Sequence, residues 1–188
     1  MSTNSTRDKI LDLGKNYMQA IGYHSFNYKM IATELNIKNA SIHHYFPSKE
    51  DLALAVIEKD RQDFNAFVKS LASQGPTERA EAMLNLYAHY FNDGKKLCVI
   101  STFEISFNDA SEPIRKASSA YCTVVIKWLA GVFNEGLQSK EFMFKGNAEE
   151  MAAMWMAALP GSLLIGRMVG ANYFHQVINR LRNSLKGE

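Results

Sequence analysis

The sequence contains little cysteine and little proline. Its 188 residues include two cysteines, Cys98 and Cys122, and four prolines. Two cysteines provide no disulfide framework, but a chain of this length with 47% hydrophobic residues can build a core without one. The polar N-terminus has no apolar signal segment, and we expect no stretch that approaches the roughly 20 apolar residues of a membrane span. These absences predict a cytoplasmic protein with no membrane partner.

Signatures of catalysis and metal binding are also missing. No Ser-His-Asp order, Gly-rich phosphate loop or pair of carboxylates on one face stands out. His43 and His44 are adjacent, so on a helix they point about 100° apart and cannot easily chelate one ion. The histidines at 24, 89 and 175 have no second His or Cys three or four residues further on. The sequence therefore predicts no enzyme, no cofactor and no metal site.

The most informative segment is residues 27–51, which predict two short helices around a tight turn and then a capped third helix. Asn27 is a favourable N-cap residue, and Ile31 and Leu35 repeat at helical spacing on one apolar face. Asn36 falls at the turn, where the chain is expected to adopt a left-handed backbone that Asn tolerates well. This arrangement is typical of a helix-turn-helix.

The second short helix begins at Lys38 or Asn39 and is expected to bury Ile42 together with Phe46 or Tyr45. Its other side is small or polar. The second helix of a helix-turn-helix uses such a side to reach base edges in the major groove. The segment therefore predicts a DNA-binding module.

The end of this module is also well marked. A residue before proline is biased away from helical backbone, so the Phe46-Pro47 pair should end the second helix. Ser48 and Asp51 fit a capping box for the next helix. Lys49 lies at that helix N-terminus, where backbone amides favour a phosphate.

The segment SIHHYFPSKEDL, residues 41–52, resembles the end of the DNA-binding domain of TetR-type (TetR/AcrR) transcriptional regulators. The similarity extends back to residues 6–11 and covers about the first quarter of the chain. Asn36 and Ala40 stand where that family usually has Gly. His43 takes the place of a frequent phosphate-contacting Tyr, and Met30 replaces a frequent acidic residue.

The charge distribution agrees with a DNA-binding N-terminus. Residues 1–50 contain six Lys or Arg and four Asp or Glu, whereas the remainder is neutral, so the whole net charge of +2 lies in this part. We expect Ser41 and His44 to contact bases and Lys49 to contact phosphate. The full set of expected DNA-binding residues is Tyr28, Lys29, Lys38, Asn39, Ala40, Ser41, His43, His44, Tyr45 and Lys49.

The rest of the chain is also predicted to be helical, so the expected fold class is all-α. Residues 1–50 would form the three-helix DNA-binding domain, and residues 51–188 a helical ligand-binding and dimerisation domain. A first helix should end at Gly22, and Gly14 within it suggests that another helix packs closely there. Further helices are expected at about 48–72, 77–92, 97–107 and 111–139, from a cap at Asn147 and Glu150 through Pro160, and at 172–185.

The last two of these helices are the expected homodimer surface. Two apolar sets lie on them. The first is Met151, Met154, Trp155, Ala158, Leu159, Leu163 and Leu164, and the second is Phe174, Val177, Ile178, Leu181 and Leu185. From the residues alone, packing against the chain's own core explains these sets equally well. The resemblance favours a dimer, because paired half-sites require a two-fold assembly.

The middle helices are the expected ligand chamber, because aromatic and soft side chains are concentrated there. The expected lining residues are Tyr87, Phe91, Cys98, Phe103, Phe107, Tyr121, Trp128 and Met154. For any single position, ordinary core packing is the stronger interpretation. Cys98 follows two lysines, which favour a thiolate, so both an electrophile sensor and a buried small residue remain open.

These observations predict a DNA-binding transcriptional regulator. The resemblance implies a dimeric repressor that binds double-stranded operator DNA and is released by a small, aromatic or lipophilic inducer. The alternative is an all-helical binding protein or enzyme whose helix-turn-helix is vestigial or binds protein.

Overall fold

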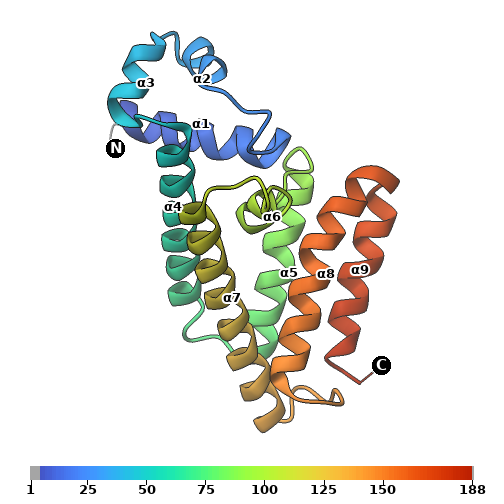
Figure 1. Cartoon of the computed structure of the whole chain (residues 1–188). Helices are drawn as coiled ribbons and strands as arrows, with labels where there is room; N and C mark the ends of the chain where they lie inside the picture. Colours follow the sequence, from blue (N-terminus) through green and yellow to red (C-terminus); the bar gives the residue numbers. More distant parts are fainter. Residues whose placement is uncertain (1–4, 188) are drawn as a thin grey trace. The chain divides into compact units, whose positions relative to one another are not determined.

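A computed structural model describes residues 5–187. Over these residues the fold consists of nine helices, which confirms the predicted all-α class (Figure 1). The helices are α1 (Thr6–Ile21), α2 (Tyr28–Leu35), α3 (Asn39–Tyr45), α4 (Lys49–Ser70), α5 (Pro76–Asn92), α6 (Val99–Glu104), α7 (Glu112–Gln138), α8 (Ala148–Val169) and α9 (Ala171–Ser184).

Backbone packing divides the described residues into two compact units. The first unit contains residues 5–65 and 99–121, and the second contains residues 66–98 and 122–187. Helices α4 and α7 each begin in the first unit and end in the second. The expected boundary after residue 50, between a DNA-binding domain and a ligand-binding and dimerisation domain, divides the chain by function rather than by packing, and it stays a prediction.

The first unit is built on α1, which contacts α2, α3 and α6. A Cβ added to Gly14 of α1 would lie 2.9 Å from a methyl carbon of Leu52 on α4, so the glycine allows these two helices to pack closely, as its position in the sequence suggested. The core of this unit is completely buried and includes Ile10, Met18, Ile31, Ile42 and Leu52. This packing holds the two short helices α2 and α3 in place.

The helix ends of the first unit follow the local signals in the sequence. Gly22 ends α1 at a φ of 88°. Asn36 ends α2 in the left-handed region, with φ 51° and ψ 48°, as predicted. Asn27 occupies the N-cap position of α2, but its side chain makes no capping hydrogen bond. The tight turn of the helix-turn-helix is therefore formed by a non-glycine residue in left-handed backbone.

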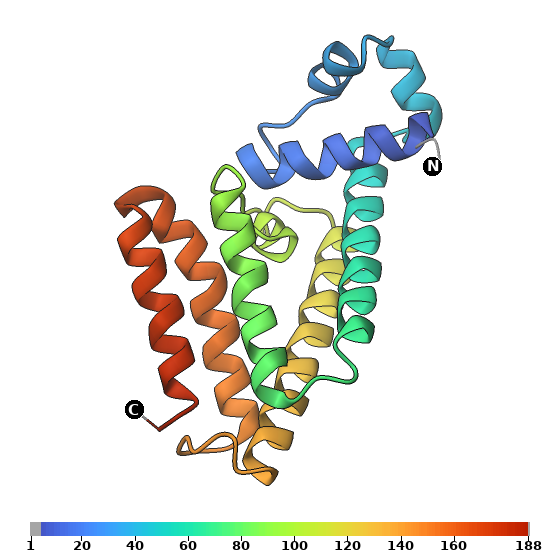
Figure 2. The same ribbon diagram turned by 180° about the vertical axis from the view of Figure 1, so that it is seen from behind.

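The second unit contains α5, α8 and α9, with α8 in contact with both others (Figure 2). Asn147 and Glu150 form the predicted capping box at the start of α8. An aromatic cluster fills the core, in which the Phe133 ring lies 5.0 Å from Trp155 and 6.2 Å from Phe142. The cluster links α7, the α7–α8 loop and α8.

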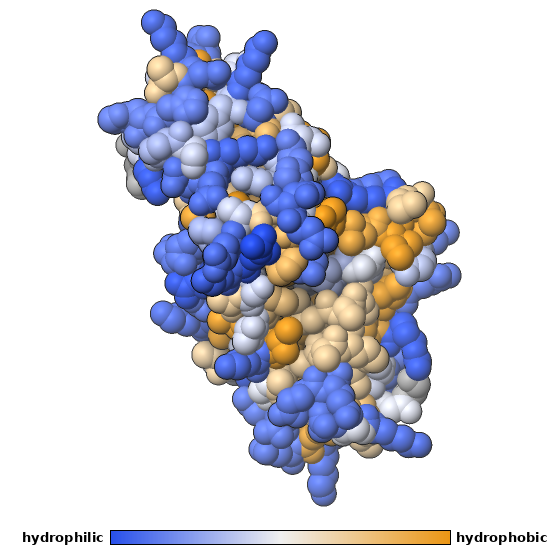
Figure 3. Space-filling model, in the orientation of Figure 1, coloured by the Kyte–Doolittle hydropathy of each residue, from blue (hydrophilic) through white to orange (hydrophobic). Residues whose placement is uncertain are grey.

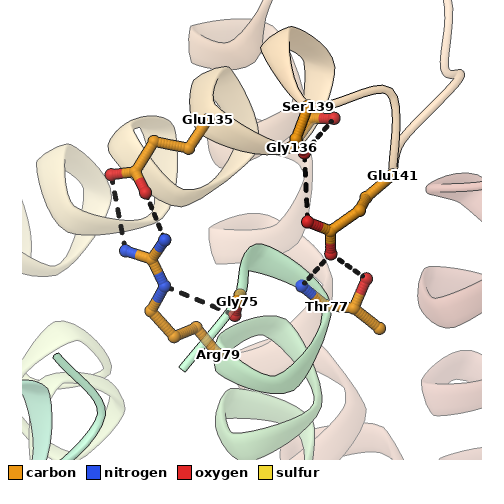
Figure 4. A network of polar contacts seen from close by, with 7 residues as sticks. All are labelled: Gly75, Thr77, Arg79, Glu135, Gly136, Ser139 and Glu141. Atoms are coloured by element: carbon orange, nitrogen blue, oxygen red, sulfur yellow. Dashed lines mark hydrogen bonds and ion pairs between the residues drawn. The ribbon is translucent and has the colours of Figure 1, made fainter. Parts of the chain in front are cut away.

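Polar contacts join the start of α5 to the end of α7 (Figure 4). Arg79 forms an ion pair with Glu135. Both the backbone amide and the hydroxyl of Thr77 donate to one oxygen of Glu141, at 3.2 and 2.8 Å. Ser139 donates to the other oxygen at 3.1 Å. These hydrogen bonds lower the pKa of Glu141, so a carboxylate distant in sequence satisfies an amide at the N-terminus of α5.

Helix α8 corrects one expectation from the sequence. We expected no stretch near the length and apolarity of a membrane span, but α8 has 22 residues and a mean hydropathy of 1.4 over its most apolar window, enough to cross a membrane by these criteria. Core helices meet the same criteria, and one face of α8 is buried against its own chain, with Ala152, Trp155, Leu159 and Leu163 fully covered. The composition thus reflects a helix that is apolar on both of its faces.

The apolar sets expected at a dimer surface are divided by the structure. On α9, Phe174, Ile178 and Leu181 are buried in the chain's own core, as is Leu185 directly after the helix. On α8, Met151, Trp155, Leu159 and Leu163 are buried in the same way. The outward side of α8 remains apolar: Met154, Ile165, Met168 and Val169 are 43%, 41%, 84% and 63% exposed. Figure 3 shows strongly apolar colours over the end of α8.

Candidate DNA-binding site

Helix α3 presents one apolar and one polar side. Ile42 is completely buried and Phe46, directly after the helix, is 2% exposed, whereas Tyr45 is 39% exposed. Of the two core partners predicted for Ile42, Phe46 is therefore the one buried with it. The residues between positions 38 and 45 that we expect to contact DNA lie on the open side. Lys38, Asn39, Ala40, His43, His44 and Tyr45 are exposed, and Ser41 is half-buried.

The turn after α3 fixes where this helix ends. Phe46 adopts extended backbone at φ −136° and ψ 92°, as a residue before proline should. The Arg7 guanidinium lies 5.1 Å from the centre of the Phe46 ring. Arg7 thus brings a positive charge close to α3 from α1. Arg7 lies within residues 6–11, to which the resemblance to TetR-type regulators extends, but it was not among the expected DNA-binding residues.

Ser48 and Asp51 form the predicted capping box at the start of α4. The Asp51 amide donates to the Ser48 hydroxyl at 3.1 Å, and the Ser48 amide donates to the Asp51 carboxylate at 2.9 Å. The helix begins at Lys49. Its N-terminus therefore follows the end of α3 by only a few residues, so a phosphate could be met there by the amides of the first turn.

Tyr28 has a different position from the other expected DNA-binding residues. Its side chain is buried, and its hydroxyl donates to the Phe46 carbonyl at 3.0 Å and also contacts the Ser48 carbonyl. Burial, followed by the nearby Asp51 carboxylate, raises the pKa of the hydroxyl far above its usual range. Tyr28 therefore positions the turn between α3 and α4, a role different from the DNA contact that the sequence predicted.

His43 is held by the same turn. Its Nδ1 lies 3.0 Å from the Pro47 carbonyl, and the ring packs edge-on against Tyr28 at 5.0 Å. A carbonyl can only accept, so Nδ1 must hold the hydrogen of this bond. The remaining nitrogen, Nε2, is then the atom available to a ligand on the exposed side. The imidazole is oriented by its contacts before any DNA is present.

Lys49 makes contacts within its own unit. Its Nζ donates to the His24 carbonyl at 3.1 Å and lies 4.7 Å from the centre of the Tyr23 ring. Burial lowers the pKa of this ammonium group. One of its three N–H donors is used by His24. Lys29 remains exposed on α2.

The residues expected to line a ligand chamber lie in both units. Tyr87, Phe91, Cys98, Trp128 and Met154 belong to the second unit, and Phe103, Phe107 and Tyr121 belong to the first. In the second unit, the Tyr87 hydroxyl lies 3.7 Å from Cys98 Sγ, both residues being buried. Phe91 stacks on Phe174 of α9 at 4.2 Å. Trp128 packs edge-on against Phe67 at 6.0 Å.

The other four expected chamber residues differ in their contacts and exposure. Tyr121 is 5% exposed and donates to Asp60 on α4 at 2.9 Å, so it packs within the first unit. Phe107 and Met154 are 40% and 43% exposed. Phe103 is buried, with its ring 5.6 Å from that of Tyr23. Among the described residues, no group of three or more His, Cys, Asp or Glu side chains could hold a metal ion.

Comparison with known proteins agrees with this geometry. Residues 10–56 match the family described as bacterial regulatory proteins, tetR family. The chain is 23% identical over 164 residues to the HTH-type transcriptional repressor NemR of Escherichia coli, covering 82% of each chain. The matched family segment spans α2, α3 and the start of α4, which form the site described above.

Solved structures resemble the whole chain. A TetR transcriptional regulator from Legionella pneumophila superposes with a TM-score of 0.87 at 27% identity, covering 99% of this chain and all of the other. A TetR-family regulator from Agrobacterium tumefaciens gives a TM-score of 0.90 at 26% identity, covering 96% and 97%. With the helix-turn-helix geometry, these similarities identify the chain as a member of the TetR family, non-enzymatic DNA-binding transcriptional regulators.

Proposed function

We propose that this regulator is a cytoplasmic homodimeric repressor that binds a two-fold related operator through α3 and is released by a small molecule bound in its helical body. The observation that supports it best is the polar side of α3, where small and polar side chains lie opposite the completely buried Ile42. A helix with this distribution can approach base edges in the major groove. The Escherichia coli relative is named a transcriptional repressor, which supports repression rather than activation.

The outward side of α8 supports a second copy as the dimer partner. Its residues follow helical spacing and include no charge between Met151 and Gly166, where Ala153, Ala157 and Gly161 are small enough for another helix to approach closely. Exposed apolar surface of this kind marks a protein interface. A two-fold dimer also meets the need for two recognition helices. Of the last two helices, α8 thus provides the main contact, because α9 buries its apolar side in its own chain.

The ligand chamber is proposed within the second unit. Tyr87 offers a hydroxyl and Cys98 a thiol within the core, and Phe91 and Trp128 provide aromatic surface. A pocket with a few polar groups among aromatic side chains suits a small aromatic or lipophilic molecule. A thermal-shift screen of such molecules, with hits retested for release of bound DNA, would identify the inducer.

The DNA-binding proposal is tested by selecting duplexes from a random pool with the full chain. We expect a preferred sequence with two related halves, and binding that weakens steeply as salt rises because phosphate contacts release counterions. The same measurement on a scrambled duplex of equal length is the control. Equal affinity for the selected and scrambled duplexes would instead support the binding-protein alternative.

The dimer is tested by light scattering of the purified chain and two variants. Met168→Asp places a charge on the outward side of α8, where Met168 is 84% exposed. Met143→Asp places the same charge at a residue that is 70% exposed in the loop before α8. We expect the first variant to be monomeric and the second to remain dimeric. A dimeric Met168→Asp protein, or a monomeric wild type, would contradict the α8 interface.

A further inference from the structure

A buried carboxylate joins three helices of the first unit. Asp60 lies on α4, and its side chain is 6% exposed. One carboxylate oxygen pairs with Nζ of Lys15 on α1 at 2.5 Å. The other accepts a hydrogen bond from the hydroxyl of Tyr121 on α7 at 2.9 Å, and the same hydroxyl lies 3.3 Å from the Asp60 carbonyl. None of these three residues belongs to the candidate DNA-binding site.

The burial of Asp60 makes both partners necessary. A charged side chain removed from water is strongly unfavourable unless each oxygen is paired. Lys15 compensates the charge, and Tyr121 satisfies the oxygen that Lys15 leaves free. The Tyr121 ring is fixed as well, because it packs edge-on against Phe64 of α4 at 6.1 Å. The cluster thus holds one arrangement of α1, α4 and the start of α7.

Helix α1 links this cluster to the recognition helix. It contacts both α2 and α3. One residue before Lys15, Gly14 allows Leu52 of α4 to pack against α1. A shift of α1 along α4 would therefore disturb a tight apolar contact and an ion pair together. Helix α7, which provides Tyr121, continues into the second unit.

We propose that Asp60 is a positioning residue: with Lys15 and Tyr121 it sets the orientation of α1, and hence of α3, and so determines which half-site spacing the dimer accepts. This proposal rests on the proposed function, because spacing has meaning only for two recognition helices in one dimer. Loss of the Tyr121 hydrogen bond would loosen the start of α7 against α4, although the ring still packs on Phe64, and it would not alter any side chain of α3. The dimer would then still recognise the sequence of each half-site but would bind a wider range of half-site spacings.

The test uses duplexes that contain two copies of the half-site selected by the wild-type chain, separated by different numbers of base pairs, and a duplex with one copy. Tyr121→Phe removes a single oxygen and keeps the ring. We compare the affinity for the duplex with the best spacing with the affinity for a duplex whose spacing is two base pairs longer. The ratio of these affinities should fall by about tenfold in the variant, as loss of one hydrogen bond to a charged group implies. Affinity for the single half-site should stay within about twofold, since α3 is unchanged.

Tyr17→Phe is a matched control, because the exposed Tyr17 hydroxyl also donates to a carboxylate, that of Glu34, but between α1 and α2. It should leave the spacing preference as in the wild type. Asp60→Asn is the second variant, since it keeps the shape of the side chain and removes its charge, and it should broaden the preference in the same way. Thermal melting of each protein establishes that it is folded.

The outcomes separate the two proposals. An unchanged spacing preference in folded Tyr121→Phe or Asp60→Asn protein would overturn the positioning role. A uniform loss of affinity on all duplexes, including the single half-site, would also overturn it, because a purely structural role predicts that result. If the wild-type chain selects no sequence at all, the proposed function itself fails.

Discussion

Two glycines of α7 offer a direct test of the packing in the second unit. Gly136 is buried, and a Cβ there would lie 2.7 Å from Cγ of Phe142 and closer still to two other carbons of the ring. Gly131, five residues earlier on the same helix, is exposed, and among the described residues nothing lies within 4 Å of its added Cβ. Alanine at both sites gains the same helix propensity, so the difference between the variants measures packing alone.

The two substitutions should change the stability of the protein in opposite directions. Replacing Gly by Ala within a helix contributes about 1 kcal/mol, so Gly131→Ala should raise the Tm by about 2–4 °C. At Gly136 the ring of Phe142 must move, and it is held against Phe133 in the aromatic cluster. Overpacking of this kind costs about 1–3 kcal/mol, and the severe overlap favours the upper end. We therefore expect Gly136→Ala to destabilise the protein by about 2 kcal/mol.

Urea unfolding followed by tryptophan fluorescence is a suitable assay, because Trp155 lies in the same cluster as Phe142. A second measurement isolates the cause. In a Phe142→Ala background the ring is absent, so Gly136→Ala should become stabilising, as at Gly131. If Gly136→Ala raises the stability as much as Gly131→Ala does, then the Phe142 ring does not pack closely against α7 at Gly136.

Three further predictions concern the DNA-binding unit. Above about pH 10 the Tyr28 hydroxyl ionises in the unfolded chain but stays neutral in the folded one, because its pKa is raised there, so the wild-type protein loses stability as pH rises. Tyr28→Phe removes this ionisation and should reduce that loss, which urea midpoints at several pH values would measure. Asn36→Ala should lower the stability by about 1–2 kcal/mol because Asn36 has left-handed backbone, which glycine but not alanine adopts readily. Asn36→Gly should therefore not destabilise the protein, and thermal melting of both variants measures the difference. Ser41→Ala and His44→Ala should each reduce discrimination between selected and mismatched duplexes by about 1–3 kcal/mol, and equal losses on random DNA would refute base contacts.

Much of the first unit could be predicted because its signals are local. The left-handed turn at Asn36, the end of α3 before Pro47 and the capping box of Ser48 with Asp51 each depend on residues within a few positions of one another. The close packing of α1 at Gly14 could be expected in kind, because an unfavourable helix residue requires a compensating contact. The partner, Leu52, could not, since it comes from a later helix.

Features that depend on side-chain direction were less predictable. Tyr28 resembled a surface residue of the motif, but its hydroxyl turns inward to backbone carbonyls that only the folded turn brings together. Helix α6 ends at Glu104, earlier than the periodicity indicated. The apolar pattern of α8 has no polar side, so the sequence could not separate its core face from its outward face or from a membrane span. That separation required the positions of α5 and α9, which both pack against α8.

Lys49 shows how the structure refines a sequence-based role. Its ammonium group is half-buried and donates one hydrogen bond to the His24 carbonyl, so two donors remain for a phosphate at the start of α4. The lowered pKa reflects a desolvated cation, which an approaching phosphate would stabilise. We expect Lys49→Ala and Lys49→Met to weaken binding to all duplexes equally.

Each Lys49 variant should also reduce the slope of log affinity against log salt by about 0.9, the value for one phosphate contact. Lys49→Met provides the decisive comparison, because it keeps the apolar stem beside Tyr23 and removes only the charge. Lys29→Met is the control for an exposed lysine on α2. If Lys49→Met retains the wild-type slope while Lys49→Ala binds poorly, Lys49 acts by packing the segment between α1 and α2, and the phosphate must be held by the amides of α4.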